Sequence, residues 1–209
     1  MDPSAYRFQR ICANVSVNSR PKKPLRAVSG VVFAGRTGPG AHALEGGRMV
    51  VRAWRFVTIL FVALLVGLAF AHVLERPAKI QYDAELYITL QRTLYVAWGP
   101  PNVGGILEPA AIFATIALIF LVRTRRPALW LTLGASVALL LAFPVVFFAL
   151  VAPANEAFLT AAPAAIPGNW MELRASWETG HAIRFVLQLA ALSLLTLAIL
   201  FETGDNPRS

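Results

Sequence analysis

The sequence predicts an all-α membrane protein, a four-helix bundle of transmembrane helices with an additional interfacial amphipathic helix. Of its 209 residues, 57% are hydrophobic and 14% are charged, and the mean hydropathy of +0.61 lies outside the range of ordinary soluble domains. Long charge-free stretches recur along the chain, and a helix needs about 20 such residues to cross the hydrocarbon core. Cys12 is the single cysteine, which excludes an internal disulfide and a cluster of thiolate metal ligands.

The first 48 residues form a basic segment without helical or strand periodicity. They contain eight of the 19 Lys and Arg residues but two acidic residues, whereas the rest of the chain has 11 basic and nine acidic residues. This charge, together with abundant Gly, Pro and Ser, predicts disorder over residues 1–48 and contact with anionic membrane lipid, and it does not indicate a nucleic-acid partner. Met49 begins the run MVVRAWRF, a natural start for a membrane protein, so a mis-assigned start codon upstream is the alternative.

Four apolar windows predict the transmembrane helices of a domain over residues 49–202, followed by a cytoplasmic tail over 203–209. The windows are residues 56–74, 110–122 with their flanks, 127–155 and 185–201. The fourth window is short because its helix is predicted to begin earlier, at Trp170, and to run to about Phe201. The first helix has an alternative as a secretory signal, since AFA at 69–71 resembles a cleavage site, but its apolar core is longer than the usual ~7–15 residues.

The distribution of Lys and Arg predicts a multi-pass cell-membrane protein with both termini in the cytoplasm. Basic residues flank the start of the first helix and fill the tight connection between the second and third helices, at Arg48, Arg52, Arg55, Arg123, Arg125 and Arg126. Most of the acidic residues fall in the two larger connections on the other side. The positive-inside tendency therefore places those larger connections outside.

The first outer connection predicts the amphipathic helix. Leu86, Leu90 and Leu94 recur at i, i+4 and i+8 among several Tyr and Trp residues, which settle at the level of lipid headgroups. The helix is expected to start at Pro77 or Asp83 and to stop at the Gly-Pro-Pro run 99–101. It either lies on the outer membrane surface or packs across the mouth of the bundle.

Local signals place the remaining boundaries. Glu108 followed by Pro109 predicts the first turn of the second helix, since an acid and a proline are both favourable there. Pro144 predicts a kink near the outer end of the third helix. The Ala- and Pro-rich run 152–168 predicts a loop, and Asn169 predicts the N-cap of the last helix, with Glu172 completing a capping box.

Six residues of the last helix predict a polar stripe. They are spaced 4, 3, 4, 3 and 4 residues apart, which keeps them on one helix face: Trp170, Arg174, Trp177, His181, Arg184 and Gln188. Ionisable groups at the entrance to a membrane are costly against lipid and normally turn into the bundle. The stripe is therefore expected to face the other helices.

The stripe and the outer ends of the first two helices predict a pocket in the outer leaflet. His72 lies near the outer end of its helix, at the depth expected for His181, and two acids lie at the same level. The predicted lining comprises His72, Glu75, Glu108, Arg174, Trp177, His181 and Arg184. The alternative is that each of these residues only reaches into the interface or pairs two helices.

Residue chemistry suggests roles within this pocket. His181 is a candidate general base, His72 its partner, and Arg184 a group that stabilises an oxyanion, while Trp177, Arg174 and Glu108 are candidate substrate contacts. His72 and His181 are equally candidates to ligate a haem iron or a single metal, and a site without a cofactor is an equal alternative. A Gly-rich phosphate loop, an HExxH run and a serine-nucleophile motif are all absent from the sequence, which argues against nucleotide, zincin and serine-hydrolase chemistry.

Three stretches resemble the anthrone oxygenase-like family of small four-helix membrane proteins: GLAFAHVLERPAK, GGILEPAAI and NWMELRASWETGHAIRFVLQLAAL. The resemblance covers roughly residues 50–202, and the family's Asn-rich stretch after the third helix is matched by Asn155 alone. Family members in fungal polyketide pathways oxygenate anthrones to anthraquinones. The resemblance implies an oxygenase or oxidoreductase site at the outer helix ends, and the positions that match are His72, Glu108, Trp177, His181 and Arg184.

Two functions follow as hypotheses. The first is an oxidoreductase of the monooxygenase type acting on a lipophilic small molecule. The second is a non-enzymatic membrane subunit, or a protein that binds a lipid or small molecule. A transporter is disfavoured, because the middle of each predicted span lacks a charged residue.

Overall fold

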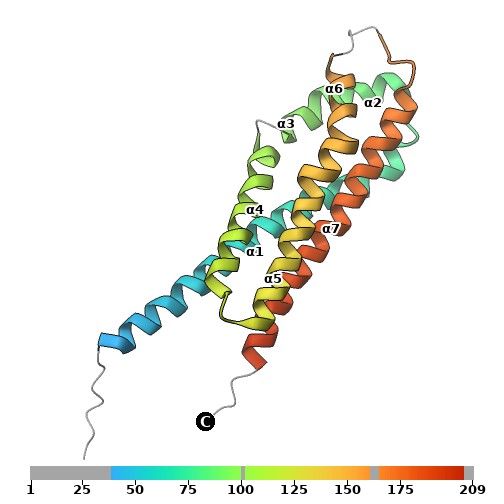
Figure 1. Cartoon of the computed structure of the whole chain (residues 1–209). Helices are drawn as coiled ribbons and strands as arrows, with labels where there is room; N and C mark the ends of the chain where they lie inside the picture. The colour runs from blue at the N-terminus through green and yellow to red at the C-terminus, as the bar shows by residue number, and fades with distance from the viewer. Residues whose placement is uncertain (1–38, 100–101, 161–164, 205–209) are drawn as a thin grey trace, which may run out of the picture. The chain divides into compact units, whose positions relative to one another are not determined.

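The computed structural model describes residues 39–99, 102–160 and 165–204, and these residues form helices without any strand (Figure 1). In chain order the elements are α1 (Pro39–Lys79), α2 (Ala84–Leu90), the π-helix η2 (Gln91–Tyr95), α3 (Val96–Trp98), α4 (Val103–Val122), α5 (Arg126–Leu140), the π-helix η3 (Leu141–Val151), α6 (Ala152–Thr160) and α7 (Trp170–Gly204). Four helical runs are long and apolar enough to cross a membrane: Glu45–Lys79, Val103–Val122, Arg126–Thr160 and Trp170–Glu202. The predicted all-α class with four transmembrane helices is confirmed.

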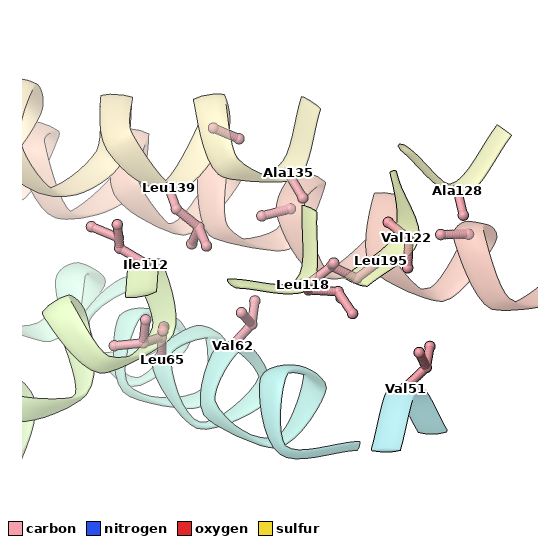
Figure 2. Close-up of a cluster of buried hydrophobic side chains, with 14 residues drawn as sticks. Val51, Val62, Leu65, Ile112, Leu118, Val122, Ala128, Ala135, Leu139 and Leu195 are labelled. Atoms are coloured by element: carbon pink, nitrogen blue, oxygen red, sulfur yellow. The ribbon is translucent and has the colours of Figure 1, made fainter. Parts of the chain in front are cut away.

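The four long runs pack as a closed ring of neighbours. Helix α1 packs against α4, α4 against α5, α5 against α7, and α7 against α1, so that α4 and α7 stand at opposite corners. The interior combines branched side chains with small ones, and Figure 2 shows Val62, Leu65, Leu118 and Leu195 converging from three helices. Small residues such as Ala135 let the helix backbones approach closely, which is how helices associate in an apolar solvent.

Charged side chains mark the two ends of the ring. Near one end, the Glu202 carboxylate lies 2.7 Å from the Arg55 guanidinium and 3.0 Å from that of Arg125. These contacts join α7, α1 and the connection between α4 and α5, and we call this the arginine end. The opposite end, which contains His72 and His181, is called the histidine end.

Residues 84–98 form a continuous helical segment, the cross helix, that packs across the histidine end, where α6 also lies (Figure 1). Asp83 caps it by accepting a hydrogen bond of 2.9 Å from the Leu86 backbone N–H, whereas Pro77 lies inside α1. The buried face carries Tyr87, Ile88, Gln91 and Tyr95. Of the predicted leucine face, Leu86 and Leu94 are 45% and 38% exposed, so they are left for contact outside the bundle. Leu90 is half-buried and packs against the aromatic cluster at this end.

Three predicted boundaries are wrong. Helix α1 begins at Pro39, so residues 39–48 are helical rather than disordered, and the remainder of the predicted segment lies outside the described residues. Helix α4 begins at Val103, which places Glu108 and Pro109 inside it rather than in its first turn. The earlier start depends on Gly104, since a Cβ there would lie 2.3 Å from the Trp98 carbonyl oxygen.

The third wrong boundary is the predicted Ala/Pro loop after the third helix. Residues 152–160 form α6, because Ala154 and Phe158 are buried against the cross helix and α7. Pro144, predicted to kink the third helix near its outer end, lies within the π-helix η3, and the kink itself stays a prediction. The start of α7 matches the prediction, since the Asn169 carbonyl accepts hydrogen bonds from the N–H groups of Glu172 and Leu173 at 3.0 and 3.1 Å.

Candidate functional site

The predicted polar stripe of α7 faces the bundle. Trp177, His181, Arg184 and Gln188 are all buried, and the same 4, 3 spacing continues through buried small and apolar residues, Ala191, Leu195 and Ala198. The interpretation that these polar residues avoid lipid by turning inward is confirmed. Long α7 thus supplies a polar half at the histidine end and an apolar half toward the arginine end.

Two histidines meet at the histidine end. The ring centres of His72, on α1, and His181, on α7, are 4.0 Å apart, and each residue is 8% exposed. The Trp177 ring lies 4.1 Å from that of His181 and 5.0 Å from that of His72. Tyr95 and Trp98 of the cross helix approach His72 to 5.1 and 5.4 Å. The imidazoles therefore sit in an aromatic enclosure that two helices and the cross helix build together.

A cavity of about 90 Å3 lies beside these rings and is partly open. Its walls come from α1, the cross helix, the first turns of α4, η3, α6 and α7. Of the seven residues predicted to line one pocket, five do so: His72, Glu108, Trp177, His181 and Arg184. The sequence-based prediction therefore identified the core of the cavity.

Glu108 and Arg184 form a buried ion pair at the floor of the cavity. Because α4 and α7 occupy opposite corners of the ring, this pair crosses the bundle interior. Gln188 Nε2 donates a further hydrogen bond of 3.3 Å to Glu108 Oε1, and the Arg184 guanidinium carbon lies 5.3 Å from the centre of the Phe147 ring. The two charges compensate each other inside an apolar medium, where either one alone is costly.

Three buried polar atoms of the cavity lining have no hydrogen-bond partner within the described part of the chain: His72 Nδ1, Arg184 Nε and Gln188 Oε1. Buried donors and acceptors are nearly always satisfied in folded proteins, by ordered water if not by protein. These three atoms are therefore the polar groups of the lining that still need a hydrogen-bond partner, from water or from a bound molecule.

Arg174 and Glu75 do not line the cavity, and their predicted place in it is wrong. The Arg174 guanidinium lies over the Trp170 ring at 4.6 Å and donates a hydrogen bond of 3.1 Å to the Tyr82 carbonyl. Arg174 lies about one turn beyond Trp177, where the chain leading into the cross helix covers it. Glu75 instead accepts a hydrogen bond of 2.5 Å from the Tyr95 hydroxyl.

A buried network above the cavity escaped the sequence-based prediction. The Lys79 side chain is 2% exposed, and its Nζ lies 3.2 Å from Glu178 Oε1 and 3.7 Å from Glu75 Oε2. The same ammonium group lies 4.5 Å from the Trp177 ring centre and 4.9 Å from that of Tyr95. Lys79 thus positions two aromatic walls of the cavity. Its spacing of seven residues from His72 on α1 is the signal that could have revealed it.

Two tyrosines of the cross helix complete this network. Tyr87 donates a hydrogen bond of 3.1 Å to Glu178, and Tyr95 donates to Glu75. Burial, reinforced by these neighbouring carboxylates, raises the pKa of both phenols above the usual range. Both hydroxyl groups therefore remain protonated donors at neutral pH.

Asn155 of α6 fixes the orientation of Trp177. Its Oδ1 accepts a hydrogen bond of 2.8 Å from the indole Nε1–H. The sequence had singled out Asn155 as a match to the resembled family without assigning it a structural partner. Close packing of α7 on η3 supports the same geometry, since a Cβ on Gly180 would lie 2.7 Å from Val151 Cγ2.

The geometry does not suit a haem held between the two histidines. Imidazoles on opposite faces of a haem iron, each bonded at about 2 Å, have ring centres roughly 6 Å apart, with the macrocycle between them. The rings of His72 and His181 are in direct contact at 4.0 Å. Over the described residues, no group of three or more His, Cys, Asp or Glu side chains is arranged to hold a metal ion. The two imidazoles are therefore not placed on opposite faces of a haem, and their ligation of a single metal stays a prediction.

Comparison with known proteins gives no information on the function. No protein-family model, curated protein or solved structure matches the chain. The resemblance to anthrone oxygenase-like proteins accordingly stays a prediction. Within the described residues, the site combines a pair of imidazoles, a compensated ion pair and three buried polar atoms without a hydrogen-bond partner, beside an aromatic enclosure.

Proposed function

We propose that the cavity binds the polar edge of a lipophilic aromatic molecule and removes a proton from it, as the first step of an oxygenase-type oxidation. The observation that carries this proposal is the direct contact of His72 with His181 inside the aromatic cavity. An imidazole is the side chain that most often serves as a general base. The resemblance of the last helix to anthrone oxygenase-like proteins supports the same chemistry.

Each residue of the site has a distinct role in the proposed reaction. His181 takes a proton from a phenolic or enolisable position, and His72, in contact with it, holds its ring in place. Arg184 stabilises the anion that forms, while Glu108 keeps the guanidinium oriented and compensated until then. With dioxygen as oxidant, the balanced conversion turns a ring methylene into a carbonyl group and releases one water molecule.

The cavity volume restricts how such a molecule binds. An apolar cavity of about 150 Å3 holds a single benzene ring, and this one measures about 90 Å3. A substrate with several rings therefore inserts its reacting edge and leaves the rest at the opening, beside half-buried Trp98, Phe143 and Phe147. This arrangement favours a membrane-soluble substrate over a water-soluble one.

A second candidate function is binding without turnover. Within the described residues, neither imidazole is hydrogen-bonded to a carboxylate, whereas a catalytic base is usually oriented by one. Glu108, the acid nearest to that role, is engaged by Arg184. In this alternative, the cavity retains a lipophilic small molecule or presents it to a partner.

Oxygen consumption distinguishes the two functions. Purified protein in lipid nanodiscs is supplied with a set of lipophilic hydroxyaromatic compounds, and oxygen uptake and binding are measured in parallel. Exchange of His181 for Gln should reduce uptake at least about 100-fold, the usual contribution of general base catalysis, while binding persists. Wild-type binding without uptake would establish the second function, and undiminished uptake by the His181→Gln variant would remove His181 from the chemistry.

We further infer that the protein lies in the cell membrane with the histidine end outward and both termini in the cytoplasm. Arg55 and Arg125 share one acid at the arginine end, where further basic residues flank the spans, and Lys and Arg accumulate on the cytoplasmic side. A reporter that is active only in the cytoplasm, fused to the C-terminus, should be active. A silent fusion to a stably inserted chain would reverse the orientation.

A further inference from the structure

A second hollow lies on the outside of the bundle, separate from the central cavity. It is a groove of about 390 Å3 on the seam between α1 and α7, lined by Arg76, Thr179, Ala182, Ile183, Val186 and Leu187. None of these six residues lines the central cavity. On α7 they lie away from the buried stripe, so the groove faces the medium around the bundle, which is lipid for a membrane-spanning helix.

The groove changes from polar to apolar along its length. Arg76 and Thr179 form the polar end, close to the end of α1. Because α1 and α7 run antiparallel, the groove then passes toward the middle of the bundle along Ile183 and Val186, which are 40% and 63% exposed. At the depth of these two residues, Phe70 of α1 stacks on Phe185 of α7 with ring centres 5.3 Å apart. The exposed apolar side chains are suited to contact with a hydrocarbon chain, and the polar end is suited to contact with a polar or charged group.

Arg76 is the charged group at the polar end, and it is available. Its side chain is exposed, and within the described residues its guanidinium makes no hydrogen bond or ion pair. It interacts electrostatically with Glu178, but that carboxylate is already bound by Lys79 and Tyr87. A free guanidinium at the rim of a membrane-facing groove is well suited to bind a phosphate, which it can engage through two parallel hydrogen bonds.

We propose that this groove binds one anionic phospholipid. The phosphate group contacts the Arg76 guanidinium and the Thr179 hydroxyl, and an acyl chain lies along Ile183, Val186 and Leu187. The order of the contacts, cation first and apolar surface after it, matches the order of headgroup and acyl chain in the leaflet at the histidine end. The site is independent of any chemistry in the central cavity.

A local fluorescence measurement tests the proposal on the full chain. In a Cys12→Ser background, a bimane label on Val186→Cys reports lipid within the groove, and brominated acyl chains quench it. In phosphatidylcholine nanodiscs, brominated phosphatidylglycerol should quench this label at about fivefold lower mole fraction than brominated phosphatidylcholine, which corresponds to one basic contact with an anionic lipid. Adding Arg76→Gln should raise the mole fraction of brominated phosphatidylglycerol needed for the same quenching by the same factor.

A label outside the groove supplies the control. Leu189 is 42% exposed on α7 but does not line the groove, so Leu189→Cys should be quenched equally by both lipids and should not respond to Arg76→Gln. Equal quenching of the Val186→Cys label by both lipids would overturn the proposal. A preference that survives Arg76→Gln, or one equally strong at Leu189→Cys, would also overturn it, because it would reflect the general lipid annulus.

Discussion

Replacing Glu108 with Ala should destabilise the bundle by about 3 kcal/mol, because it strands the Arg184 guanidinium in the interior. Arg184 is 7% and Glu108 6% exposed, so water cannot replace the lost carboxylate without entering the cavity. Gln188 also loses its acceptor, since its Nε2 donates to Glu108. A Glu108→Gln variant, which keeps a hydrogen-bond acceptor but not the charge, should lie between wild type and Glu108→Ala.

Thermal or denaturant unfolding in a fixed detergent measures this cost. Glu156, an exposed acid on α6, is the matched control, and Glu156→Ala should change the unfolding free energy by less than about 0.5 kcal/mol. Combining Glu108→Leu with Arg184→Met removes both charges and should recover most of the loss. A cost for Glu108→Ala no larger than that of the control would refute the buried ion pair as the bond between opposite corners.

Three further predictions concern packing, the Trp177 hydrogen bond and pH. Gly180→Ala should lower the unfolding free energy by about 1–3 kcal/mol in the same assay, because the added Cβ would lie 2.7 Å from Val151 Cγ2. Gly67→Ala is the control and should stabilise by up to ~1 kcal/mol, because no atom lies within 4 Å of its added Cβ. Equal effects of the two substitutions would contradict the close approach of α7 to η3. Asn155→Ala should cost about 1–2 kcal/mol and shift the Trp177 fluorescence, whereas an unchanged spectrum would mean that the indole is not held there. The stability linked to the raised pKa of Tyr87 and Tyr95 is fully present below the unfolded-state pKa of about 10 and lost above it, so the Tm should fall above pH ~10. A double Tyr→Phe variant at these positions should flatten that fall, and an unaltered pH profile would contradict it.

Spacing along helices predicted the parts of the site that one helix supplies. The 4, 3 pattern from Trp177 to Gln188 fixed a face of α7, and the cost of exposing charge to lipid fixed its direction. The equal depth of His72 and His181 followed from two helix ends, and their ring contact at 4.0 Å agrees with it. Such inferences need only helix geometry and the preferences of side chains at a membrane.

The parts that depend on contacts between distant segments were not predictable in this way. Leu86 and Leu94 form a regular apolar face, yet the cross helix buries Tyr87 and Tyr95, because the bundle end offers carboxylates for their hydroxyl groups. Lys79 is buried because α1 extends to this residue. The charged residues at the end of α1 made that extension difficult to predict from the sequence.

The start of α4 was missed although Asn102, a favoured N-cap residue, directly precedes Val103. Gly104 permits this start, because a Cβ there would lie 2.3 Å from the Trp98 carbonyl oxygen. The spacing of Arg174 places it on the polar stripe. Its guanidinium nevertheless lies outside the cavity, where it donates a hydrogen bond to the Tyr82 carbonyl. Periodicity therefore assigns a face, and packing decides where along that face the cavity ends.

The ionisation of a bound ligand shows whether His181 removes a proton, because it reports this step without requiring turnover. A lipophilic hydroxyaromatic compound whose anion absorbs at a distinct wavelength is added to the protein in nanodiscs at neutral pH. An anion band should appear with the wild-type protein and disappear with His181→Gln, while binding of the neutral form persists. A ligand that binds in the cavity but stays neutral in the wild type, or an anion band of equal strength in the variant, would show that His181 does not remove the proton.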